Sequence, residues 1–289
     1  MPSILCVLQG GLGNQLFILH SVMSIAFATG SSCVFLENIP RNSVTIRQPY
    51  WTTLFEPLRK LVVNEEQFSS LCERAICLNE PAEYSDSFFD KVNEIVKVQG
   101  KSVLLRGYFQ DIRYLGSLSV RSYISRKIGF PTMQHLFPCS KDVALHFRYG
   151  DYLQLRSVYT ILGANYYISA LRYFLQQDPL LKTVQCFCEE ADSALVVNLI
   201  THHLIKLFPL LTFTIVEFSI PDWQQLFQIS NCKHIAIANS TYSWWAAFIA
   251  TNSRSKQSLH QVCYPSDWYV DTTKVPPNVP DSWKQIMLF

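Results

Sequence analysis

The first 36 residues follow an order that is typical of a parallel β-α-β unit. Residues 3–9 (SILCVLQ) form a short apolar run rich in strand-forming side chains. A glycine turn separates them from residues 16–30 (LFILHSVMSIAFATG), which have the length of a helix and end in a glycine suited to a helix C-terminus. A second apolar run, SCVFLE, follows. Because parallel strands need a crossover connection, this order predicts strand, turn, helix and strand.

A second series of alternating segments begins after Pro131 and Pro138. Its first member is the apolar run VALHF at 143–147. The further strands are expected at 184–188, 211–217 and 234–238, and the helices at 165–177, 192–205, 223–230 and 242–250. This alternation predicts a second doubly wound parallel sheet. We therefore expect an α/β protein with two domains, residues 1–137 and residues 138–289.

The part of the chain before this second series is only partly assigned. Residues 102–109 (SVLLRGYF) predict a buried strand, and residues 112–128 predict one helix with basic residues on its outer face. Residues 40–100 mix polar and apolar positions and contain several prolines, so little is predicted there.

The composition excludes several classes of protein. Hydrophobic residues make up 49% of the chain and charged residues 16%, which excludes a disordered protein. A net charge of +2 gives no basic field for nucleic acid or for an anionic membrane. No Lys or Arg precedes the first apolar run, and the uninterrupted apolar stretch 16–28 is short for a membrane span. We expect a soluble, cytoplasmic protein without a membrane anchor and without a nucleic-acid partner.

The first polar motif is the glycine turn QGGLGNQLF at 9–17. Gly11, Gly13 and Asn14 lie between a strand and a helix, where backbone N–H groups can approach an anion. A dinucleotide fingerprint would need a third glycine where Leu16 stands. A tight turn without a ligand explains this motif equally well.

Two further motifs follow predicted strands. In HFRYGDY (146–152), His146 and Arg148 are two residues apart and point the same way, and Arg148 can hold a phosphate in bidentate geometry. In ANSTYSWWAA (238–247), an amide and three hydroxyls precede an apolar helix. Such side chains usually cap a helix, but their number here also suits the binding of a diphosphate.

Together these motifs resemble those of the α-1,2-fucosyltransferase family, whose members are inverting, GDP-fucose-dependent glycosyltransferases with a His-x-Arg-x-Gly-Asp motif. The resemblance also includes the segments GYFQ (107–110), NYY (165–167), CKHIAIANS (232–240) and VPDSW (279–283), all in the expected order. It therefore covers nearly the whole chain.

The resemblance implies a GT-B-like fold of two Rossmann-type domains facing a cleft, with the N-terminal domain on the acceptor side and the C-terminal domain binding GDP-fucose. By the same resemblance, Arg148 contacts the donor β-phosphate, His146 lies near the guanosine, and Glu189-Glu190 stand where relatives recognise guanine with two Asp residues. Tyr149 stands where relatives usually have a second Arg. The residues expected to bind the donor are Gly11, Gly13, Asn14, His146, Glu189, Glu190, Asn239, Ser240, Thr241 and Ser243.

For the reaction we expect a transfer of L-fucose to a glycan acceptor, with an α-1,2 linkage to galactose. Arg148 and the helix N-terminus after Ser243 would stabilise the departing diphosphate without a metal. The nearest match to an Asp-x-Asp metal motif is Glu190-Ala-Asp192, a weak candidate. Asp151 belongs to the signature and is the expected second catalytic residue, although Glu37 and Asp111 are alternatives as general base.

Two other functions remain open from the sequence. A nicotinamide-dependent oxidoreductase would use the glycine turn for NAD(P) and Glu37 for the ribose. A catalytically inactive nucleotide-sugar-binding module would explain the tyrosine at position 149.

Overall fold

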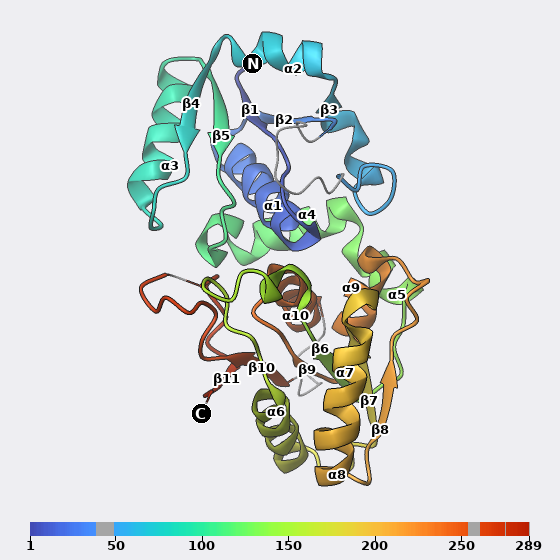
Figure 1. Ribbon diagram of the computed structural model, residues 1–289. Helices are drawn as coiled ribbons and strands as arrows, with labels where there is room; N and C mark the ends of the chain where they lie inside the picture. Colours follow the sequence, from blue (N-terminus) through green and yellow to red (C-terminus); the bar gives the residue numbers. More distant parts are fainter. Residues whose placement is uncertain (39–48, 254–260, 275, 289) are drawn as a thin grey trace. The chain divides into compact units, whose positions relative to one another are not determined.

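The computed structural model describes residues 1–289 except 39–48, 254–260, 275 and 289 (Figure 1). The chain divides into two compact units, Met1–Pro131 and Thr132–Phe289. The sequence placed this division after residue 137, at the second of two proline-marked breaks. Pro131 instead lies in the first turn of helix α5 (Phe130–Leu136), where a residue without an N–H is tolerated.

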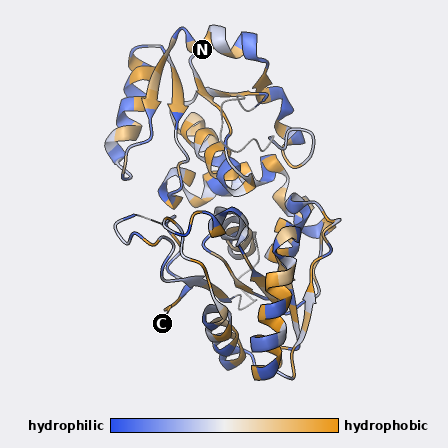
Figure 2. Ribbon diagram, viewed as in Figure 1, coloured by the Kyte–Doolittle hydropathy of each residue, from blue (hydrophilic) through white to orange (hydrophobic). Residues whose placement is uncertain are grey.

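The first unit is built on a parallel five-stranded sheet in the order β3-β2-β1-β5-β4. Its strands are β1 (Ser3–Cys6), β2 (Ser32–Leu36), β3 (Val62–Val63), β4 (Ala75–Asn79) and β5 (Ser102–Arg106). The central strand β1 pairs with β2 and β5, and Leu5 lies opposite Val34 and Leu104. Figure 2 shows β4 and β5 in mainly hydrophobic colours. The predicted strand–turn–helix–strand unit is confirmed.

Helix α1 (Leu12–Thr29) is the crossover between β1 and β2. It ends at Gly30, which adopts the left-handed conformation at φ 69° and donates its N–H to the carbonyls of Ala26 and Phe27. Among the described residues, α1 has the length and apolar composition of a membrane span, but 78% of it is buried inside the protein. Its packing against β1, β2 and α4 is that of a core helix.

Two predictions for this unit were wrong in detail. The strand predicted to reach Phe109 ends at Arg106, because Glu80 accepts the N–H of Tyr108 and Phe109 has a positive φ of 53°. The helix predicted for 112–128 is two helices, η3 (Ile112–Leu115) and α4 (Leu118–Ile128), because Gly116 at φ 77° breaks the chain direction.

The segment for which the sequence predicted little contains regular elements in its described part. These are η1 (Glu56–Leu61), α2 (Glu65–Cys72), α3 (Asp86–Asn93) and the π-helical turn η2 (Glu94–Val98), besides β3 and β4. Residues 39–48 of that segment lie outside the described residues.

The second unit contains a parallel six-stranded sheet in the order β11-β10-β9-β6-β7-β8. The strands are β6 (Val143–His146), β7 (Thr183–Phe187), β8 (Thr212–Ile215), β9 (His234–Ala236), β10 (Gln261–Pro265) and β11 (Lys284–Ile286). The helices are η4 (Gly150–Leu153), α6 (Ala164–Gln177), η5 (Glu190–Asp192), α7 (Ser193–Leu199), η6 (Ile200–Leu204), α8 (Ile205–Leu207), α9 (Asp222–Asn231) and α10 (Thr241–Ser253). The predicted doubly wound sheet is confirmed, and β10 and β11 were missed.

The strand order locates the place where a ligand is expected in this sheet. From β6 the chain proceeds outward through β7 and β8, and then returns to the other side of β6 to add β9, β10 and β11. The carboxyl ends of β6 and β9 therefore flank a topological switch point, where open α/β sheets bind ligands.

Candidate functional site

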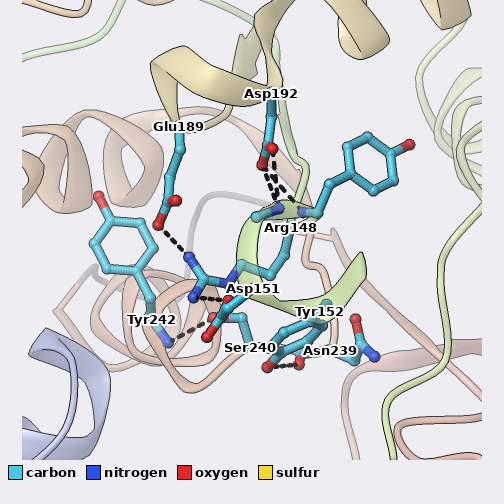
Figure 3. Close-up of polar contacts among 10 residues, drawn as sticks. Arg148, Asp151, Tyr152, Glu189, Asp192, Asn239, Ser240 and Tyr242 are labelled. Atoms are coloured by element: carbon cyan, nitrogen blue, oxygen red, sulfur yellow. Dashed lines mark hydrogen bonds and ion pairs between the residues drawn. The ribbon is translucent and has the colours of Figure 1, made fainter. Parts of the chain in front are cut away.

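Two of the three polar motifs meet at this switch point, and a carboxylate from a third strand joins them (Figure 3). Arg148 lies two residues after β6, Asn239 lies three residues after β9, and Glu189 lies two residues after β7. Because β9, β6 and β7 are neighbours in the sheet, their carboxyl ends bring these side chains to one edge. The sequence predicted each motif at a strand end, and the sheet order explains why they converge.

Arg148 is the centre of the polar contacts in Figure 3. Its guanidinium forms ion pairs with Glu189 and, at 2.5 Å, with Asp151. The guanidinium carbon also lies 5.2 Å from the centre of the Tyr152 ring. Burial alone would lower the pKa of Arg148, but the charges of Glu189 and Asp151 offset that effect and raise it. Arg148 is therefore a permanently charged, largely buried group, with a side chain only 15% exposed.

The carboxylates around Arg148 are much more exposed than the arginine itself. The side chain of Asp151 is 53% exposed and that of Glu189 is 42% exposed. Exposed ion pairs contribute little free energy, so an incoming anion can replace either carboxylate at small cost. The arrangement suits a site that exchanges its own carboxylates for a phosphate.

Asp192 fixes the turn that follows Arg148. Its carboxylate accepts the N–H of Tyr149 at 3.2 Å and that of Gly150 at 2.9 and 3.0 Å, and the residue is 3% exposed. The sequence considered Asp192 only as part of a weak metal motif. In the structure its oxygen atoms are hydrogen-bonded to the backbone, so Asp192 positions the turn that carries Arg148.

Tyr149, which stands in place of a second arginine, belongs to the core. It is 6% exposed, its hydroxyl donates to the carbonyl of Leu162 at 3.1 Å, and its ring lies 6.4 Å from that of Phe147. Tyrosine at position 149 therefore places an aromatic side chain in the interior of the second unit.

We predict that Tyr149→Arg destabilises the protein by at least about 3 kcal/mol, because it would bury a charged side chain among the core residues that surround the Tyr149 ring. Tyr149→Phe loses one hydrogen bond and should cost only about 1 kcal/mol. Urea unfolding of the three proteins measures both values. A Tyr149→Arg protein as stable as wild type would contradict the core placement of this side chain.

His146, the last residue of β6, is a buried neutral side chain. It is 7% exposed, its ring lies 5.4 Å from that of Tyr242, and its backbone carbonyl accepts the hydroxyl of Tyr167 at 3.1 Å. Within the described part of the chain, its Nδ1 atom has no hydrogen-bond partner. Burial, assisted by the charge of Arg148, lowers the pKa of His146 to about 3.

This lowered pKa makes stability depend on pH in a defined direction. The unfolded chain binds the His146 proton near pH 6.5 and the folded chain only near pH 3, so acid favours unfolding. We expect His146 to contribute a fall in the free energy of unfolding of up to about 1.4 kcal/mol per pH unit below pH 6.5. His146→Gln should flatten this slope between pH 6 and pH 4 in urea unfolding, and an unchanged slope would contradict the assignment.

The loop after β9 is held by its own side chains. Asn239 donates its amide to the carbonyls of Thr160 at 2.9 Å and Trp268 at 2.8 Å. Ser240 accepts the N–H of Tyr242 at 3.3 Å, and the buried hydroxyl of Ser243 donates to the carbonyls of Ala238 and Ser240. Like the Nδ1 of His146, the buried Oδ1 of Asn239 has no hydrogen-bond partner among the described residues.

These contacts build the N-terminus of α10 at the switch point. The backbone N–H groups of the first helical turn lack intrahelical acceptors and favour an anion. Thr241, the first residue of α10, is partly buried there. The hydroxyl of Tyr152 donates to the carbonyl of Asn239 at 3.0 Å and so connects this loop to the Arg148 motif. Roles for Asn239, Ser240, Thr241 and Ser243 in donor binding remain predictions.

The other residues predicted for the site lie in two places. Glu190 is exposed at the start of η5, beside Glu189. Gly11, Gly13 and Asn14 belong to the first unit, where Gly11 is the N-cap residue of α1 and the Oδ1 of Asn14 accepts the amide of Gln110 at 2.9 Å. Their approach to a donor stays a prediction.

Each carboxylate considered as a general base pairs with a cation. Glu37 pairs with Arg59, and Asp111 pairs with Arg113 at 2.6 Å and caps helix η3. Asp151 pairs with Arg148, as described above.

Comparison with known proteins identifies the family and the fold of the chain. Residues 81–261 match the model of the family described as glycosyl transferase family 11. The chain is 22% identical to an alpha-1,2-colitosyltransferase of Escherichia coli, over 93% of each chain. It is 28% identical to the O-antigen biosynthesis glycosyltransferase WbnK of Escherichia coli, over 50% of this chain and 44% of that protein.

Among solved structures, POFUT1 in complex with GDP-fucose is similar at a TM-score of 0.52 and 10% identity, over 90% of this chain and 97% of that one. At this identity the similarity concerns the fold alone. The fold is GT-B-like, with two Rossmann-type units, as the sequence predicted.

Proposed function

Because the chain belongs to glycosyl transferase family 11, we propose that it transfers L-fucose from GDP-fucose to a galactose hydroxyl of a glycan, forming an α-1,2 linkage. The observation that carries this proposal is the buried charge of Arg148 at a switch point, beside the N-terminus of α10 and the Nδ1 of His146, which has no partner among the residues that the structure describes. Membership of a glycosyltransferase family favours this function over a nicotinamide-dependent oxidoreductase.

In the proposed reaction the diphosphate binds where Arg148 and the first turn of α10 converge. The guanidinium fork donates two hydrogen bonds to phosphate oxygens, and the helix N–H groups donate to the others. As the bond between the sugar and the diphosphate breaks, negative charge develops on the leaving group, and these donors stabilise it without a metal. The acceptor hydroxyl attacks from the opposite face of the sugar, so the configuration is inverted. It gives its proton to a carboxylate, for which Asp151 is our candidate once the phosphate has replaced it at Arg148.

Glu189 can take part in donor binding once the phosphate replaces it at Arg148. Its carboxylate would then be available to accept the N1–H and the 2-amino group of guanine, the role that the resemblance assigns to this position. Nearby Glu190 is the alternative acceptor. Neutral His146 would meet the nucleoside as a hydrogen-bonding group without charge.

A second candidate donor differs from the first by one hydroxyl. The relative that matches 93% of this chain is an alpha-1,2-colitosyltransferase, and colitose is L-fucose without its 3-hydroxyl. A GDP-linked colitose would present the same diphosphate to Arg148. The comparison of GDP-fucose with GDP-colitose as donors, by kcat/KM, decides between the two sugars.

The test of the proposed activity is the product. We expect purified protein to release GDP from GDP-fucose in the presence of lactose and EDTA, and proton NMR to show an α-anomeric fucose on O2 of galactose. GDP binding without turnover on any β-galactoside would favour the inactive binding module. Absence of both binding and turnover would contradict the proposal. A cytoplasmic location, without a nucleic-acid partner, is part of the same proposal.

A further inference from the structure

The first sheet has a switch point of its own. From β1 the chain proceeds to β2 and β3 on one side, and it returns through β4 to β5 on the other side. The segments that follow β1 and β5 therefore flank the position at which an α/β sheet binds ligands. Residues 107–111 (GYFQD), which follow β5, have no role in the function proposed so far.

The backbone of this loop is strained. Phe109 has a φ of 53°, and among the described residues it is the one non-glycine residue with a positive φ. A conformation of this kind costs about 1–3 kcal/mol and persists only where the surroundings impose it. The strain is therefore an observation that the packing of the loop has to explain.

Two groups of contacts impose the conformation. The Phe109 ring is fully buried and lies 5.2 Å from the ring of Tyr114 and 6.1 Å from that of Phe88. On the backbone side, the carboxylate of Glu80 accepts the N–H of Tyr108 at 2.7 Å. A Cβ atom on Gly107 would lie 2.3 Å from the Cβ of Glu80, so only glycine fits at the start of the loop.

The result is a fixed set of uncharged recognition groups. Tyr108 is 42% exposed, because the chain turns its side chain outward while Phe109 turns inward. The amide of Gln110 donates to Asn14 at 2.9 Å, and the amide of Gln9 donates to the carbonyl of Gly107 at 3.5 Å. Three half-buried side-chain amides and one exposed aromatic ring thus lie along the ends of β1 and β5.

This chemistry matches an uncharged sugar. Each amide offers both donors and an acceptor, which suits hydroxyl groups, and an aromatic face suits the apolar C–H face of a pyranose ring. The loop 107–111 contains no Lys or Arg to neutralise a phosphate.

We propose that Gln9, Tyr108 and Gln110 form the subsite for the neutral acceptor sugar, with Glu80 as the positioning residue of the loop. The inference rests on the proposed function and adds the acceptor side to it. Tyr108 stacks on the sugar ring, and the amides bind its hydroxyls.

The first test uses Tyr108→Ala and Gln110→Ala, with lactose as the probe. Tyr123→Ala is the matched control, because Tyr123 is 40% exposed on α4 of the same unit. We expect the lactose KM to rise about tenfold in both subsite variants and to stay unchanged in the control. The GDP-fucose KM and the slow hydrolysis of GDP-fucose without acceptor should remain within twofold of wild type, since neither needs the acceptor sugar.

Glu80 is tested separately, with exposed Glu83→Gln as control. Glu80→Gln should raise the lactose KM about tenfold with donor hydrolysis unchanged, and Glu80→Asp should partly restore it. A change in unfolding stability without a change in the lactose KM would reduce Glu80 to a structural residue and would overturn its positioning role.

Saturation-transfer NMR with lactose removes the dependence on turnover. We expect lactose signals with wild type and with Arg148→Ala, and none with Tyr108→Ala. Transfer with a wild-type lactose KM in Tyr108→Ala and Gln110→Ala would overturn the subsite and leave the proposed function intact. If wild type binds lactose through Tyr108 but releases no GDP from GDP-fucose, the proposed function is overturned and the subsite stays intact. No lactose binding to wild type would also overturn the subsite.

Discussion

Replacing Arg148 with alanine is expected to lower kcat/KM for fucosyl transfer by about 10³-fold, the size of loss found when a donor to a developing negative charge is removed. The side chain is largely buried at the switch point, and no other cation of the signature replaces it, because position 149 is a core tyrosine. Initial rates of GDP release measure the effect.

Two further variants serve as comparisons for Arg148→Ala. Arg172→Ala removes an exposed arginine from α6 of the same unit and should leave the rate unchanged. Arg148→Lys keeps the charge but loses the bidentate fork, so we expect an intermediate loss of about 10²-fold. A rate for Arg148→Ala within tenfold of wild type would show that this arginine does not stabilise the leaving diphosphate.

Asp192→Asn is expected to lower both stability and activity. The buried carboxylate accepts two backbone N–H groups. In asparagine an NH2 group replaces one of the two oxygen atoms, and because this group is itself a donor, it cannot accept a backbone N–H. We expect a loss of about 2–3 kcal/mol in the free energy of unfolding, the range for hydrogen bonds to a charged group. The turn also sets the position of Arg148, so kcat should fall by about 10²-fold, as for a misplacement of about 1 Å.

The matched control for Asp192 is Glu190→Gln, an exposed carboxylate two residues earlier in the same turn of helix. It should retain wild-type stability. Urea unfolding of both variants, and the GDP-release rate of Asp192→Asn against wild type, provide the comparison. Wild-type rates in a destabilised Asp192→Asn protein would mean that Asp192 supports the fold without positioning Arg148.

The sequence was sufficient to predict the two sheets, because their strands and helices alternate at regular spacing and each polar motif follows an apolar run. It missed β10, a five-residue strand with three buried positions, and it failed where elements are short or solvent-exposed. Strand β3 has two residues, only one of the five residues of β4 is buried, and β11 has three residues. Such segments contain too few apolar residues to show the hydrophobic periodicity of a strand or a helix.

The partners of the site residues could not be predicted in the same way. Glu189 and Asp192 meet the Arg148 turn from about forty residues away in sequence, through the pairing of β6 with β7. Nothing local distinguishes the carboxylate that binds backbone N–H groups from the one that pairs with arginine. Similarly, the motif identified Tyr149 as a missing charge, and only the structure shows, through its burial and its contact with Leu162, that the side chain is part of the core.

We propose above all that Arg148 and its surroundings bind a guanosine diphosphate sugar without a metal. Calorimetric titration of GDP and GDP-fucose into wild type and Arg148→Ala, each in the presence of EDTA, tests it most directly. We predict that both nucleotides bind to wild type and that Arg148→Ala weakens both at least about 100-fold, close to 3 kcal/mol. Absence of binding to wild type, or equal binding to Arg148→Ala, would contradict the account.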